Sequence, residues 1–270
     1  MAIIAVAPTT RTTRLGPSTL QIAHRSLLRY MRTPQLIVLG TIQGAMFLLI
    51  FRYVFGGAIP IKGGIPYVDF LVPGFITTGV LFTGMNAASG AAEDLQQGFV
   101  DRLRSLPVPR VCFLTGRAIA DTAWNTWGLI VTAAIGFAVG FRIHGPVLDS
   151  LAAFGLCVVF GFAFEWLFIM LGLMAGTLQA AQGMALLIFP LTFVSSAYIP
   201  VSSMPGWLQA FASHQPITYM VDAVRSLSQG HAAELLIGRS TEYLVTASLL
   251  WALGFVVVFA PLAALRYKHS

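Results

Sequence analysis

The sequence predicts an all-α membrane protein with six transmembrane helices. Hydrophobic residues make up 57% of the chain, charged residues make up 10%, and the mean hydropathy is +0.80. A soluble domain carries about a quarter charged residues. The apolar residues form long stretches that are separated by short polar segments. These stretches do not alternate between apolar and polar residues, as the strands of a membrane β-barrel would.

Six stretches are long enough to cross a bilayer, because a spanning helix takes about 20 mostly apolar residues. A helix also satisfies its backbone polar groups within the segment, as hydrocarbon requires. We predict spans at Gln35–Phe55, Val68–Ala92, Cys112–Gly140, Asp149–Ala175, Ala180–Ile199 and Tyr243–Ala264. Residues 1–34 are assigned to a cytoplasmic tail with an interfacial helix, and residues 35–270 to the six-span domain.

The distribution of Arg and Lys predicts the orientation of these spans. Eleven such residues lie before the first span, around the segment between the second and third spans, and in the C-terminal tail, whereas four lie in the opposite loops. This bias predicts a multi-pass protein of the plasma membrane with both termini in the cytoplasm. The net charge of +6 is therefore a topology signal. Outside the spans the sequence has no basic stripe with interleaved aromatic residues, so nucleic-acid binding is not predicted.

Several enzyme classes are excluded by the absence of their motifs. A P-loop needs Gly-Lys before Ser or Thr, but Lys62 follows Ile61 and Lys268 follows Tyr267. Neither a zinc-protease H-E-x-x-H motif nor a G-x-S-x-G nucleophile elbow occurs, and the five histidines are scattered. We expect no catalytic residue and no metal site in this chain.

Two polar segments flank the predicted spans on the basic side. Ser18–Thr33 has the period of an amphipathic helix, with apolar residues on one arc and Arg25, Arg29 and Arg32 on the other. Such a helix suits the membrane surface, where Arg reaches anionic lipid headgroups. The alternative is a basic flank that only fixes topology.

The segment between the second and third spans is the most polar internal stretch. We predict a short charged helix at Glu93–Leu106, ended by Pro107 and Pro109 because proline interrupts a helix. It either docks onto a soluble partner or is a solvated connector. Its charged residues are Glu93, Asp94, Asp101, Arg102 and Arg104.

The segment Tyr198–Gly230, before the last span, is too polar to cross a bilayer yet carries several large apolar side chains. Pro200, Pro205 and Pro216 divide it into short pieces. We predict one or two short helices that dip into the outer leaflet and are shielded by protein, because irregular backbone cannot face lipid.

This segment also carries a family resemblance. Phe189–Leu227 resembles the signature region of ABC type-2 permeases, and in particular of the daunorubicin-resistance type of exporter. The cytoplasmic run that includes Glu93, Gly98 and Arg102 resembles the same family's loop. The matching signature residues are Pro190, Pro200, the Pro205-Gly206-Trp207 turn, the run Gln215-Pro216-Ile217-Thr218-Tyr219, and Arg225.

The resemblance implies a permease that pairs with a second copy or a paralogous permease and binds a dimer of separate ABC ATPase subunits. Mg-ATP would be hydrolysed in those subunits, with no cofactor in this chain. The loop helix with Glu93 would be the coupling helix, the helix with Arg25 would contact the ATPase, and Tyr198–Gly230 would be an extracellular re-entrant hairpin. Its candidate residues are Pro200, Trp207, Pro216, Tyr219 and Arg225.

Two carboxylates fall inside predicted spans, where a charged side chain costs about 2.5–3.5 kcal/mol on insertion scales. Glu165 lies in the fourth span among aromatic residues, next to Trp166. It either faces a transport cleft or is a protonated carboxyl bonded to a neighbouring helix. Asp121 lies one turn after Arg117, so we predict a local pair, with a cargo role as the alternative. Glu165, Asp121 and Trp166 are the transport-pathway candidates.

These observations predict the permease subunit of an ATP-driven exporter that moves an amphipathic cargo, such as a drug, lipid or glycolipid, out of the cytoplasm or inner leaflet. Membrane lipids are expected contacts. The alternative is a proton-coupled secondary transporter or channel that uses Glu165 and Asp121. Secondary transporters often carry an inverted repeat of broken helices. The sequence shows no such repeat, which disfavours that alternative.

Overall fold

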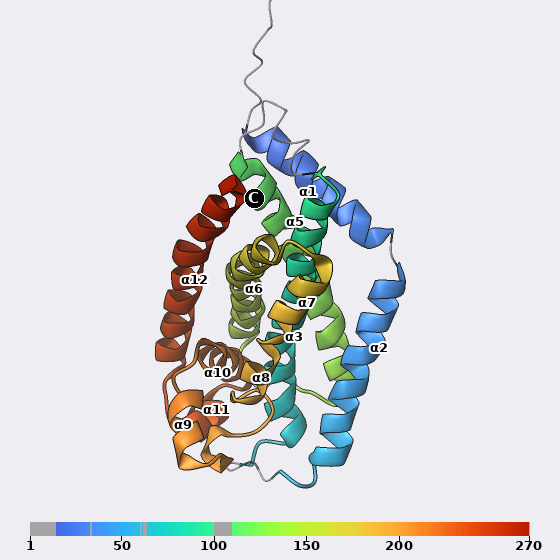
Figure 1. The fold of residues 1–270 in the computed structure, drawn as a ribbon. Helices are drawn as coiled ribbons and strands as arrows, with labels where there is room; N and C mark the ends of the chain where they lie inside the picture. The colour runs from blue at the N-terminus through green and yellow to red at the C-terminus, as the bar shows by residue number, and fades with distance from the viewer. Residues whose placement is uncertain (1–14, 33, 60, 62–63, 100–109, 270) are drawn as a thin grey trace, which may run out of the picture.

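The computed structural model describes residues 15–32, 34–59, 61, 64–99 and 110–269, and this part of the chain is built from helices and their connections (Figure 1). The first half contains α1 (Leu15–Met31), α2 (Pro34–Ile50) with the π-helical turn η1 (Phe51–Phe55), α3 (Tyr67–Gln96) and α5 (Arg110–Ala138). The second half contains α6 (Val147–Ala175), α7 (Leu178–Leu186), α8 (Phe189–Phe193), η2 (Val201–Ser203), α9 (Gly206–Ala212), α10 (Pro216–Gln229), α11 (His231–Ile237) and α12 (Thr241–His269).

Within the described ranges, four helices are long and apolar enough to cross a membrane, at Val38–Phe55, Tyr67–Gln96, Val147–Ala175 and Thr241–Lys268. They coincide with the first, second, fourth and sixth predicted spans. The third predicted span coincides with α5, which is 29 residues long but carries Arg117, Asp121 and Asn125. The structure therefore confirms an all-helical membrane protein with four such helices.

The fifth predicted span is wrong as a single helix over Ala180–Ile199. The chain instead forms α7 and α8, which end at Phe193 and are shorter than the other four. Pro190 lies in the first turn of α8. Because proline has no backbone N–H to donate to the preceding turn, it fits the start of a new helix better than the interior of a long one.

The predicted start of the charged helix at Glu93–Leu106 is also wrong. Glu93 and Asp94 lie in the last turn of α3, which continues without a break from the predicted second span to Gln96. Gly98 follows with a positive φ of 65°, a backbone conformation that favours glycine. Asp101, Arg102 and Arg104 lie outside the described residues.

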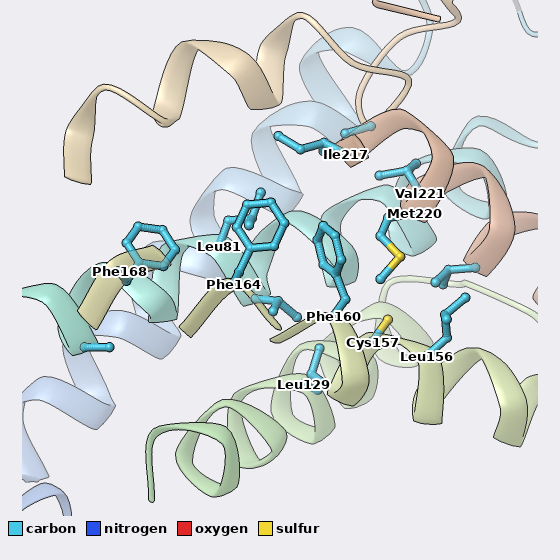
Figure 2. Close-up of a cluster of buried hydrophobic side chains, with 14 of the residues drawn as sticks. Leu81, Leu129, Leu156, Cys157, Phe160, Phe164, Phe168, Ile217, Met220 and Val221 are labelled. Carbon is cyan, nitrogen blue, oxygen red and sulfur yellow. The ribbon is translucent and has the colours of Figure 1, made fainter. Parts of the chain in front are cut away.

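The core lies where α3, α6 and α10 meet, with α5 and α12 on its flanks (Figure 2). Phe160, Phe164 and Phe168 repeat every four residues along α6 and are buried, as expected for one face of a helix. Van der Waals contact and small residues drive such packing in a bilayer. Gly172 of α6 illustrates this, because an added Cβ would overlap the carbonyl oxygen of Ala88 in α3.

The prediction of short helices in Tyr198–Gly230 is confirmed, because this segment contains η2, α9 and α10. Pro205 precedes the first residue of α9, and Pro216 begins α10. Residues 217–229 of α10 are buried on every side, and this helix packs on α3, α6 and α12. Protein therefore shields its backbone, as the sequence argument requires.

Candidate functional site

Helix α1 lies across one end of the bundle, over the end of α3 and the beginning of α5 (Figure 1). Ile22 and Ala23 are its buried side chains and point to the protein. The approach is closest at Gly116 of α5, where an added Cβ would lie 2.7 Å from the carbonyl oxygen of Thr19. The amphipathic pattern predicted this helix, and α1 covers most of the predicted residues 18–33.

A group of charged residues joins these three helices, and we call it the charged cluster. It consists of three guanidinium groups, three carboxylates and one phenol, so its formal charges cancel. Its members are Arg25, Arg29 and Tyr30 of α1, Glu93 and Asp94 of α3, and Arg117 and Asp121 of α5.

Asp94 lies at the centre of the charged cluster and is 2% exposed. Its Oδ2 accepts a hydrogen bond of 2.6 Å from Nη1 of Arg117, which is also buried. Its Oδ1 lies 3.6 Å from Arg25 Nη2 and 3.7 Å from Arg29 Nη1. Arg29 also pairs with the more exposed Glu93. The carboxylate of Asp94 thus faces three guanidinium groups, and these contacts join α1 to α3 and α5.

Asp121 completes the charged cluster, and its predicted pairing with Arg117 is confirmed by a distance of 3.3 Å from Arg117 Nε to Asp121 Oδ2. The hydroxyl of Tyr30 donates to Asp121 Oδ1 at 2.7 Å, and its ring stacks on Trp124 at 5.0 Å. Burial, with the negative charge of Asp121, raises the pKa of Tyr30 well above its usual value. Tyr30 therefore stays a proton donor, and both Asp121 oxygens are engaged within the protein.

The interfacial arginines do not share one environment. Arg25 and Arg29 belong to the charged cluster, whereas the amphipathic pattern predicted that they reach anionic lipid headgroups. Arg32 lies just beyond α1 and is exposed. Tyr30 was not predicted as a member of this site, because its hydrogen bond to Asp121 depends on the tertiary contact between α1 and α5.

Glu165 is buried at 1% exposure in the middle of α6. Nδ2 of Asn125 in α5 donates to Glu165 Oε1 at 3.0 Å and to the carbonyl oxygen of Val80 in α3 at 3.3 Å. This geometry fits a carboxyl bonded to a neighbouring helix, one of the two hypotheses for Glu165. Trp166 is 6% exposed and meets Phe162 edge to face at 6.1 Å. In this conformation Glu165 and Trp166 do not line an open surface of the chain.

Toward the opposite end of the bundle, the side chain of Arg225 in α10 is fully buried. Its Nη1 donates to Asp222 at 2.8 Å, its Nε to the carbonyl oxygen of Phe70 at 3.0 Å, and its Nη2 to that of Ser196 at 2.7 Å. The guanidinium carbon also lies 3.7 Å from the centroid of the Phe70 ring. Burial lowers the pKa of Arg225 to about 10, partly offset by Asp222, so the side chain is charged at neutral pH.

Arg225 therefore ties α10 to the beginning of α3 and to the loop after α8. The other residues predicted for this segment occupy different environments. Tyr219 is 8% exposed, whereas Trp207 on α9 is 77% exposed. Pro200 precedes η2, and Pro216 begins α10. Asp222 was not predicted, although its position three residues before Arg225 on a helix could have identified the pair.

Comparison with known proteins agrees with this architecture. The family model described as ABC-2 type transporter matches residues 17–228. The daunorubicin resistance ABC transporter permease protein DrrB1 of Streptomyces coeruleorubidus is 30% identical over 254 residues, which cover 94% of this chain and 87% of that protein. The probable doxorubicin resistance ABC transporter permease protein DrrC of Mycobacterium tuberculosis is 26% identical, covering 93% and 88%.

The inner membrane transport permease YadH of Escherichia coli is also similar, with 26% identity over 74% of this chain and 78% of that protein. The family match includes α1, the charged cluster and the segment around Arg225. The predicted resemblance is thus confirmed, and the chain belongs to the ABC-2 type transporter family as a membrane permease that works with a partner ABC ATPase.

Proposed function

We propose that this chain is the transmembrane subunit of an ATP-driven exporter that moves an amphipathic molecule out of the cytoplasm or inner leaflet. The similarity to two permeases named for resistance to daunorubicin and doxorubicin carries this proposal. We therefore favour a drug-like cargo, with a lipid or glycolipid as the second candidate. The functional unit would contain two permeases, this chain with a second copy or a paralogue.

The proposed topology has six crossings, in which α5 and the α7–α8 pair add to the four long apolar helices, and both termini lie in the cytoplasm of a plasma-membrane protein. The exposed apolar side chains along α2 and α12 support a lipid-facing or permease-facing surface. A cysteine at the exposed Ser203 should react with an impermeant thiol reagent from outside, and one at the exposed Lys268 only after permeabilisation. The native Cys112 and Cys157 are buried, so background labelling should be low. The reverse labelling pattern would refute the topology.

The charged cluster supports a route from the ATPase to the membrane helices. It lies beside the connection between α3 and α5, where the resemblance places the coupling helix, and it fixes α1 to both helices. Mg-ATP would bind and react in the partner ATPase. Reversing the charges of Asp101 and Arg102 should uncouple ATP hydrolysis from transport while expression stays intact. Full transport and full drug-stimulated ATPase activity in that variant would refute the coupling assignment.

The direct test reconstitutes the permease with its ATPase in inside-out vesicles and measures uptake of doxorubicin. We expect uptake to require ATP and to stop when the P-loop lysine of the ATPase is replaced. The proton-coupled alternative predicts uptake with a proton gradient and no ATPase, and predicts its loss in Glu165→Gln. The contacts of Asp121 with Arg117 and Tyr30 instead support a role for this carboxylate in joining α1 and α5.

A further inference from the structure

A cavity of about 440 Å³ lies between α6, α8, α9 and α12, under the first turn of α10. This volume is within the range of about 300–1,000 Å³ for pockets that hold drug-sized ligands. Phe164 and Ile217 form its floor and are 3% and 2% exposed; both belong to the core shown in Figure 2. The cavity does not include Glu165, Asp121 or the charged cluster.

Three phenylalanines and one tryptophan are among the twelve residues that line this cavity. Phe255 of α12 stacks on Phe164 with centroids 4.2 Å apart and an interplanar angle of 27°. Trp251 and Phe211 lie at the mouth and are 41% and 51% exposed. Rings of this kind favour a ligand that is itself a ring system, because offset-stacked and edge-to-face pairs add about 0.5–1.5 kcal/mol beyond the burial of area.

His214 is the titratable residue among the side chains that line the cavity. Its Nδ1 lies 2.8 Å from the carbonyl oxygen of Ala210 and 3.0 Å from Oγ of Ser213, so this ring nitrogen is engaged within the protein. Nε2 is the ring nitrogen left to contact a ligand. The side-chain NH2 group of Gln215, also in the wall, already donates to the carbonyl oxygens of Leu191 and Val194.

We propose that this cavity binds the ring system of the amphipathic cargo, with a hydroxyl group of the cargo hydrogen-bonded to Nε2 of His214. The inference rests on the proposed export function and adds to it a place and a chemical class: a polycyclic, hydroxyl-bearing compound that is neutral where it lies in the wall. Among the residues that the structure describes, no carboxylate lines the cavity, so charge selection is not part of the proposed recognition. Shape and ring stacking would select the cargo.

The test is equilibrium binding of doxorubicin to the purified permease in lipid nanodiscs, followed by fluorescence. Ala210→Trp places a large side chain in the cavity wall and should weaken binding more than tenfold. Ala232→Trp is the matched control, because Ala232 is exposed on α11 and does not line the cavity. His214→Ala should weaken binding about two- to tenfold, as expected for one hydrogen bond. Elution volume and unfolding temperature verify that each variant is folded.

Equal binding by Ala210→Trp and Ala232→Trp, or no saturable binding to the wild type, would overturn the proposal. So would competition by a fluorescent phosphatidylcholine with the same loss in Ala210→Trp, because the occupant would then be a lipid chain. The vesicle assay decides the export function separately. A complex that exports no doxorubicin would refute the proposed cargo, while the two tryptophan variants would still decide whether the cavity is a ring-binding site.

Discussion

Neutralising Asp94 should destabilise the protein far more than neutralising its neighbour Glu93. Asp94→Asn removes the charge that faces Arg117 at 2.6 Å, and both side chains are about as buried as the core, at 3% and 5% exposure. A hydrogen bond to a charged group contributes about 1.5–3 kcal/mol, and breaking a fully buried ion pair costs about 3–5 kcal/mol. Because Asp121 still lies 3.3 Å from Arg117, the lower range of about 1.5–3 kcal/mol applies.

Glu93→Gln is the matched control, since it makes the same chemical change one residue earlier on the same helix. Its partner Arg29 is 40% exposed and Glu93 itself is 29% exposed, so solvent screens this pair and the expected loss is about 0–1 kcal/mol. The measurement is the free energy of unfolding of the purified protein in mixed micelles with increasing dodecyl sulfate. A double variant with Arg117→Gln should lose less than the sum of the two single losses, because the two residues interact directly.

Equal losses in Asp94→Asn and Glu93→Gln, or additive losses in the double variant, would refute the central place of Asp94 in the charged cluster. Asp94→Asn should also loosen α1, because Arg25 and Arg29 lose their buried partner. Hydrogen exchange measures this directly, and we expect faster exchange in residues 15–31 with unchanged exchange in α12. Uniform protection of α1 in the variant would show that apolar packing alone holds this helix.

Two further predictions concern packing and a helix end. Gly172→Ala should destabilise the protein by about 1–3 kcal/mol, because its Cβ would overlap the carbonyl oxygen of Ala88, whereas Gly155→Ala on the same helix has open space and should be neutral or slightly stabilising; similar unfolding curves would refute the close approach. Hydrogen bonds from the hydroxyl and backbone N–H of Thr241 lower the pKa of Glu234. The stability that this adds is present above the ordinary carboxyl pKa and is lost as the pH falls through the lowered value. Glu234→Gln should therefore lower the unfolding temperature at neutral pH and match the wild type in acid, and a pH-independent difference would contradict this assignment.

The sequence predicted the helices whose formation depends on composition alone. The long apolar stretches became α2, α3, α5, α6 and α12, with ends within a few residues of the predictions. The prolines correctly divided the segment before α12. The prediction of the fifth span as one helix failed because hydropathy is averaged over a window and does not detect the break between α7 and α8. The predicted end of the second span was too early, because a charged residue such as Asp94 can continue a helix when it has a buried partner of opposite charge.

The polar contacts of the candidate site could be predicted only where both partners lie on one helix. Arg117 and Asp121 are four residues apart, and their pairing follows from helical spacing. The bonds from Asn125 to Glu165 and from Arg117 to Asp94 join different helices, so they depend on the rotation of each helix about its axis. A single sequence specifies which face is apolar, but a helix that is apolar on all sides, such as α6, leaves that rotation open.

This difference changes the expected location of cargo recognition. From the sequence alone, intramembrane charge marks a functional site, because an unpaired charge in hydrocarbon is costly. In the structure Asp94, Arg117, Asp121 and Arg225 each have a partner of opposite charge, and Glu165 accepts a hydrogen bond from Asn125. The cost of burying the four charged residues is therefore offset by their ion pairs, whereas Oε2 of Glu165 is buried with no hydrogen-bond partner among the described residues. The cavity beside α10 is lined in part by aromatic rings, and no carboxylate is among its described lining residues, which makes it a better candidate for cargo than any of the four paired residues.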